Sequence, residues 1–366
     1  MNRRQFARIL ASAPFTYGLA ACAQPAAPTP TVAPSPVPAS SPSTDLSAIK
    51  QYLNESLAVL ARDTAALKGQ ANSYYQLADA SAFDYAALWQ AQPQKVTETI
   101  SAARSAWMAA SPGYERVEGI VAGVPSLAEF DLILDAGSSA AEGGDSVVPF
   151  DLKLPNGQVL AKPGNLFGVT ESALWGTEPS FQAGVADLDG DGSTGFGDTL
   201  PDANILKAAT DTLDSYVQQL ITAAGQWQPN EADAFTALVT MVPTMSEYFE
   251  SWKNSRFVAG ESSTQRDFVA ISRLADIQDI LGGLQIVHQG VSPLIKQVDA
   301  SEDSQIGQEL ADLKSFVADV AKQEQEGRRY TAEEADTLGA EAQNRATAIT
   351  GRITQIAARL NIAIAS

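Results

Sequence analysis

Two glutamates three residues apart, Glu115 and Glu118, are the side chains whose spacing most directly suggests shared chemistry in this sequence. They belong to the run Tyr-Glu-Arg-Val-Glu at 114–118, and residues three apart on a helix share one face. Paired carboxylates inside a helical bundle can hold a hard cation or act as an acid/base pair. A solvated helix face with Arg116 beside the acids is the alternative, and the spacing alone leaves both open.

Four further acids extend this candidate metal site. Asp131 and Asp135 are four residues apart beside an apolar stretch, a position that also suits the acids of helix ends and turns. Glu171 lies among Phe, Val, Leu and Trp in a predicted helix that ends at Gly176, and burying a glutamate there is costly unless it is paired or ligates something. Glu247 belongs to an aromatic helix that could line the same cleft; a surface acid is its alternative.

Residues 187–198 carry a second pattern, in which acids occupy positions 1, 3, 5 and 12 and glycine occupies position 6. This is the calcium-loop pattern of the EF-hand, except that position 12 is aspartate rather than glutamate. We expect a Ca²⁺ site that stabilises this loop rather than a calcium sensor. An Asp/Gly-rich turn without a metal is the alternative. The predicted Ca²⁺ ligands are Asp187, Asp189, Asp191, the carbonyl of Ser193, and Asp198.

Composition excludes several classes of site. The 366 residues include one histidine, His288, and one cysteine, Cys22, so neither an internal disulfide nor a zinc centre built on several histidines can form. His288 stands beside apolar residues on a predicted helix, which is more typical of a core or surface histidine than of a ligand. The formal net charge of −19 argues against nucleic acid as a partner and favours cations.

The N-terminus has the features of a lipoprotein export signal. Arg3 and Arg4, followed by Phe6, resemble the twin-arginine signal, and the apolar run behind them is too short to span a membrane. The segment that ends at Cys22 reads Leu-Ala-Ala-Cys, which resembles the bacterial lipobox whose cysteine is lipidated. We therefore expect a lipid anchor on Cys22 and an extracytoplasmic location, at the periplasmic face or the cell surface. An ordinary signal peptide with an incidental cysteine is the alternative.

Three segments follow from this pattern. Residues 1–21 form the signal peptide, 22–45 a proline-rich extended linker behind the lipidated cysteine, and 46–366 the folded body. The linker composition, rich in Pro, Ala, Ser and Thr, cannot bury a core.

The body is predicted to be all-α, as a pair of packed helical bundles with one long Gly/Asp-rich loop insertion at 136–203. Apolar residues recur every three or four positions, which predicts helices. Thr44 or Ser47 could cap the first of them, and Pro112 is expected to kink or break the second. The only strand-like segment is 147–160, with a turn at 155–157. The helices begin near residue 46 and then cover 94–122, 205–220, 232–255, 264–289, 303–324 and 333–364.

The body resembles imelysin-like lipoproteins of the EfeO/EfeM type, which are associated with bacterial iron uptake. The 114–118 run matches that family's Tyr-Glu-Arg-Ile-Glu helix, and Asp131 or Asp135 occupies the place of its following acid. Residues 167–175 lie along its Gly-Phe-His-x-x-Glu-x-x-Leu-Trp stretch. Residues 272–279 and 330–336 resemble its C-terminal segments, so the likeness covers most of 46–366.

This resemblance implies a helical fold and a protein that captures iron for an uptake system, with an iron permease or another envelope component as partner. The family histidine is replaced by Gly168, so the implied metal site is all-carboxylate: Glu115, Glu118, an aspartate and Glu171. Oxygen-only ligands suit Fe³⁺, Ca²⁺, Mg²⁺ or Mn²⁺. One alternative is a Ca²⁺-stabilised scaffold that binds a protein or polysaccharide without metal chemistry. A metallopeptidase is the other, and it would need a ligand replacing the missing histidine.

Overall fold

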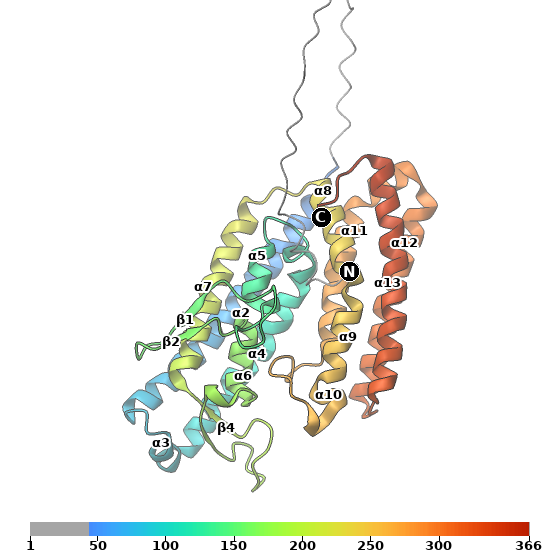
Figure 1. The fold of residues 1–366 in the computed structure, drawn as a ribbon. Helices are drawn as coiled ribbons and strands as arrows, with labels where there is room; N and C mark the ends of the chain where they lie inside the picture. The colour runs from blue at the N-terminus through green and yellow to red at the C-terminus, as the bar shows by residue number, and fades with distance from the viewer. Residues whose placement is uncertain (1–43, 366) are drawn as a thin grey trace, which may run out of the picture.

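The computed structural model describes residues 44–365, and these are helical over most of their length (Figure 1). The predicted signal peptide, Cys22 and nearly all of the linker lie outside the described residues. None of the helices in the described part is long and apolar enough to cross a membrane. The fold class predicted from the sequence, all-α, is confirmed.

The first half of the body is built on three long helices that lie side by side, with one shorter helix at their end and another packed alongside them (Figure 1). Its helices are α2 (Ser47–Ala80), α3 (Tyr85–Ala91), α4 (Pro93–Val121), α6 (Leu166–Trp175) and α7 (Ala203–Gln226). The leucines that predicted α2, including Leu53, Leu57, Leu60 and Leu67, are fully buried against α4 and α7. Burial of this apolar face is what stabilises the helix.

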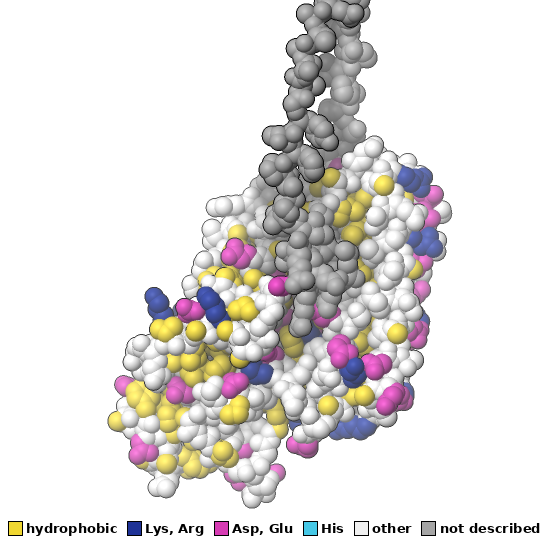
Figure 2. All heavy atoms as spheres, in the orientation of Figure 1, with side chains coloured by type: hydrophobic (Ala, Val, Ile, Leu, Met, Phe, Trp, Pro, Cys, Tyr) yellow, Lys and Arg dark blue, Asp and Glu magenta, His cyan; other side chains and the backbone are white. Residues whose placement is uncertain are grey.

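The second half packs its own helices against one another. They are α8 (Glu231–Met241), α9 (Met245–Asn254), α10 (Arg256–Ala259), α11 (Arg273–Val298), α12 (Ala300–Gln325) and α13 (Ala332–Leu360). The two halves meet where α11 packs along α4, and one continuous set of buried apolar side chains runs through both. On the face shown in Figure 2, acidic and basic side chains are interspersed over both halves.

The insertion between α4 and α7 holds short elements around α6. These are α5 (Ala128–Asp131), the π-helix η1 (Leu132–Ala136), β1 (Asp151–Lys153), β2 (Val159–Ala161), the 3-10 helix η2 (Pro179–Phe181), β3 (Gln182–Val185) and β4 (Thr199–Pro201). β1 and β2 form an antiparallel hairpin around the predicted turn of the strand-like segment, with Leu152 opposite Leu160. Gly157 supplies the positive φ of 86° that its turn requires. The antiparallel pair β3–β4 was not predicted.

Several predicted helix boundaries are wrong, and prolines or caps explain some of them. The N-cap of α2 is Leu46 and makes no side-chain cap hydrogen bond, so neither Thr44 nor Ser47 caps it. α4 is not broken and continues through Pro112. The predicted helix 232–255 is interrupted at Pro243 by the 3-10 helix η3 (Val242–Thr244).

The largest boundary error concerns the predicted helix 264–289. Helix α11 begins only at Arg273, and residues 263–272 before it are irregular. We call this segment the strap. Phe268 in the strap has a φ of 59°, in the left-handed region that a helix cannot accommodate.

Candidate metal centre

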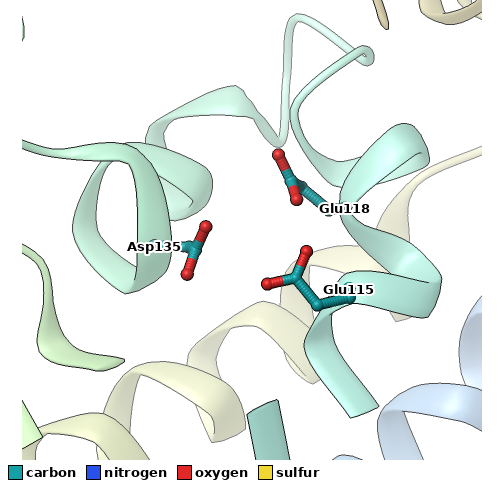
Figure 3. A group of neighbouring side chains, drawn as sticks. All are labelled: Glu115, Glu118 and Asp135. Atoms are coloured by element: carbon teal, nitrogen blue, oxygen red, sulfur yellow. The ribbon is translucent and has the colours of Figure 1, made fainter. Parts of the chain in front are cut away.

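Three carboxylates converge where the two halves of the body meet. Glu115 and Glu118 project from α4, and Asp135 projects toward them from η1 (Figure 3). An oxygen of each lies within 4.8 Å of an oxygen of the others. The three residues are 1%, 0% and 3% exposed, so the alternative of a solvated helix face is wrong. We call Glu115, Glu118 and Asp135 the carboxylate trio.

Local helix geometry brings the trio together. The spacing of three places both glutamates on one face of α4, as the sequence predicted. Residues 132–136 form a π-helix, whose wider turn is frequent at functional sites. It aims Asp135 at α4, whereas Asp131, four residues earlier, accepts a hydrogen bond of 3.0 Å from the buried hydroxyl of Tyr114.

A buried arginine faces the trio from α11. The guanidinium of Arg273 is 3.4 Å from Glu115 Oε1 and 3.6 Å from Asp135 Oδ2, and it donates a 3.0 Å hydrogen bond to Asp276 Oδ2. Its centre lies 3.7 Å from the centre of the Phe268 ring and 4.8 Å from that of the Tyr248 ring. The Tyr248 hydroxyl donates a 2.8 Å hydrogen bond to Glu118 Oε1.

Several buried acids share one guanidinium in this centre. The carboxyl groups of Glu115, Asp135 and Asp276, all buried, lie against the guanidinium of Arg273. Burial raises the pKa of Glu115 and of Asp135 well above the ordinary range, and neighbouring acids such as Asp276 add to the rise. Burial also raises the pKa of Asp276, to about 6. The centre therefore attracts positive charge, which either protons or a cation can supply.

Glu171, a ligand implied by the family resemblance, has another role in this structure. Its carboxylate accepts three backbone hydrogen bonds from the strap, from the N–H groups of Phe268, Val269 and Ala270 at 2.7, 2.9 and 2.8 Å. Burial raises the pKa of Glu171 to about 8, although these N–H groups oppose the rise. Glu171 is thus buried and paired, as its apolar surroundings required, but its partner is the strap backbone.

The space that a histidine side chain at position 168 would need is occupied by the carboxylate of Asp267. A Cβ added at Gly168 would lie 2.3 Å from Oδ2 of Asp267, so no larger side chain fits there unless Asp267 moves. Asp267 pairs with Arg266 at 2.8 Å and receives a 3.3 Å hydrogen bond from the Ser172 hydroxyl. The strap therefore occupies the space above this turn of α6.

Glu247 and His288 lie apart from the trio. Glu247 is half-buried on α9, and the neighbouring Tyr248 is the side chain that reaches Glu118. His288 is buried and lies 3.3 Å from Asp303 Oδ1, which links α11 to α12. Burial lowers the pKa of His288, with the Asp303 charge opposing the shift. His288 is the core histidine that its apolar neighbours suggested.

The predicted calcium loop brings three aspartates together. Oxygens of Asp187, Asp189 and Asp191 lie within 4.8 Å of one another at a largely exposed position. Asp198 is buried, and its two oxygens accept backbone N–H groups of Leu188 and Gly195 at 2.9 and 2.8 Å. Ser193 donates its N–H and its hydroxyl to Asp191.

Arg273, Asp276 and Tyr248 are the residues of this centre that sequence reasoning did not single out. The segment 272–279 carried a family resemblance, yet nothing in its residue types marked Arg273 as buried. An arginine at a helix start ordinarily lies on the surface. The one signal in the sequence that Arg273 has a partner is Asp276, the acid three residues later on the same helix face.

Fold and site together thus define a class of protein: an all-α body with a buried carboxylate centre between its two halves. The chain matches the family model of imelysin, peptidase M75, over residues 48–353. It therefore belongs to the imelysin family, and the match includes the trio, Arg273 and the aspartate loop. No curated protein matches the chain.

Proposed function

We propose that this imelysin-family protein captures a hard metal cation, iron first, through the carboxylate trio, as an extracytoplasmic component of iron uptake of the EfeO/EfeM type. The observation that carries the proposal is the convergence of three buried carboxylates within 4.8 Å of one another. These groups have almost no surface exposed to bulk solvent, so a cation at their centre would replace part of the lost solvation.

The donor set fits such an ion. Oxygen-only ligands suit Fe³⁺, Mn²⁺, Mg²⁺ or Ca²⁺ better than Zn²⁺ or Cu²⁺. The buried Oε2 of Glu115 makes no hydrogen bond within the described residues and is free to ligate. Glu115, Glu118 and Asp135 would supply the ligands, with Asp131 as a further acid beside them.

Binding without hydrolysis is part of the proposal, although the family carries a peptidase name. A hydrolytic metal needs an open position for water and substrate beside its ligands. The trio is almost completely buried, and the family histidine is absent at Gly168. These two observations favour a cation store or carrier over a metallopeptidase.

The aspartate loop is proposed as a second, structural cation site. Asp187, Asp189 and Asp191 present oxygens on the surface that suit Ca²⁺. A Ca²⁺-stabilised scaffold that binds a protein or polysaccharide at the envelope is the second candidate function. The convergence of these aspartates favours it, and it requires that the trio bind no metal.

Removal of the glutamate pair separates the two candidates. In the Glu115→Gln/Glu118→Gln variant we expect iron affinity to fall at least about 100-fold, because two of three charged ligands are lost. The matched Asp187→Asn/Asp189→Asn variant should keep its iron and lose Ca²⁺. Titration calorimetry of the metal-free chains with Fe²⁺ under anaerobic conditions, and with Ca²⁺, measures both. Iron binding that survives the glutamate change and vanishes with the loop change would contradict the proposal.

The proposed location is a bacterial membrane, reached through a lipid on Cys22, with an iron permease or another envelope protein as partner. The lipobox resemblance of the segment before Cys22 supports it. We expect Cys22→Ser to move the protein from the membrane fraction to the soluble fraction in a bacterial host, with loss of incorporated labelled palmitate. A variant that stays membrane-bound and labelled would refute lipidation at this cysteine.

A further inference from the structure

The guanidinium of Arg273 lies against the same carboxylates that would hold the cation. It faces Glu115 at 3.4 Å and Asp135 at 3.6 Å, two of the three members of the trio. Arg273 is itself only 4% exposed, so its charge is confined to this centre. Arg273 thus partly neutralises two members of the trio.

The contacts of Arg273 are unequal. Charge-assisted N–H···O bonds usually measure about 2.7–2.9 Å, so the contacts with Glu115 and Asp135 are long. The hydrogen bond to Asp276, at 3.0 Å, is the shortest of the three. Asp276 is not a member of the trio. The Nε atom is buried and makes no hydrogen bond within the described residues. Arg273 is therefore anchored outside the trio and only loosely engaged with it.

Aromatic stacking strengthens the anchor. The Phe268 ring, carried by the strap, lies 3.7 Å from the guanidinium centre, and cation–π contacts of this kind are favourable when desolvated. Glu171 holds the strap through the N–H groups of residues 268–270. Asp276 and Phe268 together give the guanidinium a position that needs neither Glu115 nor Asp135.

A metal ion in the trio would meet Arg273 at close range. Two positive charges a few ångströms apart in a poorly solvated interior repel strongly, and both would draw on the same oxygens. We propose that Arg273 is the built-in competitor of the cation: it neutralises the metal-free site and gives up Glu115 and Asp135 when the cation binds. This inference rests on the proposed function of the trio. The competition with Arg273 would set the affinity of the trio for the cation.

The test is the affinity of a chain without that competitor. The full chain carrying Asp187→Asn/Asp189→Asn, so that the loop does not contribute, is titrated anaerobically with Fe²⁺ with and without Arg273→Gln. We expect Arg273→Gln to bind Fe²⁺ at least about tenfold more tightly, because no guanidinium must be displaced. Arg62→Gln, at an exposed arginine, is the control and should leave the affinity unchanged.

The outcomes separate this inference from the proposed function. If the parent chain binds no iron and Arg273→Gln does, the competitor is real and capture by the natural chain is refuted. If both bind with equal affinity, or Arg273→Gln binds more weakly, the inference is overturned and capture stands. If neither binds, both are overturned.

A second variant covers the case in which Arg273→Gln does not fold. Arg273→Lys keeps a positive charge but cannot span Glu115 and Asp135 with a planar fork. We expect severalfold tighter Fe²⁺ binding than in the parent chain, and unchanged or weaker binding overturns the inference.

Discussion

Replacing Arg273 by methionine is expected to lower the free energy of unfolding of the metal-free protein by about 3–5 kcal/mol at pH 8. Removing one partner of a buried ion pair leaves uncompensated charge, and losses of this size are typical. Here the guanidinium contacts Glu115, Asp135 and Asp276, all of them buried. At pH 5 the loss should be smaller, because the carboxyl groups can take up protons in place of the lost cation.

Urea unfolding of the metal-free chain followed by circular dichroism measures this effect. Arg62→Met is the matched control, since Arg62 pairs with Asp63 on the surface and its side chain is 73% exposed. Exposed pairs contribute about 0–1 kcal/mol. A loss for Arg273→Met no larger than that for Arg62→Met would mean that Arg273 does not neutralise the centre.

The metal-free protein is also expected to lose stability as the pH rises from 5 to 8. A carboxyl group whose pKa is higher in the folded than in the unfolded chain binds its proton preferentially in the fold. Its contribution is therefore present below the unfolded pKa and lost as the pH rises through the folded pKa. Burial raises the pKa of Asp276 from 3.8 to about 6 and that of Glu171 from 4.5 to about 8. The expected loss is about 3 kcal/mol or more.

Urea midpoints at several pH values test this expectation. Glu171→Gln removes one of the titrating groups and should flatten the decline, whereas Glu55→Gln, at an exposed position, should leave the slope unchanged. Saturating iron should also flatten it, because bound metal stabilises ionised carboxylates. Stability that increases between pH 5 and pH 8 would show that these carboxyl groups are ionised in the fold without cost.

The helices and two of the three members of the trio could be predicted from local patterns. The leucine spacing of α2 and the three-residue spacing of Glu115 and Glu118 both depend on helix periodicity, which the sequence carries directly. Glu171 could be predicted to be buried and partnered because its neighbours are apolar. Its partner is the strap, about 97 residues later in the chain, and no local signal identifies such a pairing.

The remaining features depend on tertiary context. The choice of Asp135 over Asp131 follows from the π-helix, and a π-turn has no reliable signature in residue types. Nearly all of the strap was predicted as the beginning of the helix 264–289. The carboxylate of Glu171 instead binds three of its backbone N–H groups, and Phe268 adopts a positive φ. Long-range hydrogen bonds thus override local propensity there.

The location of bound iron is the most direct test of the carboxylate centre. Crystals of the full chain grown with iron, measured on both sides of the iron absorption edge, give an anomalous map that marks the metal alone. We expect a peak among Glu115, Glu118 and Asp135, with the guanidinium of Arg273 turned toward Asp276. An iron peak only at Asp187, Asp189 and Asp191, or no peak in crystals soaked to saturation, would contradict the proposed function.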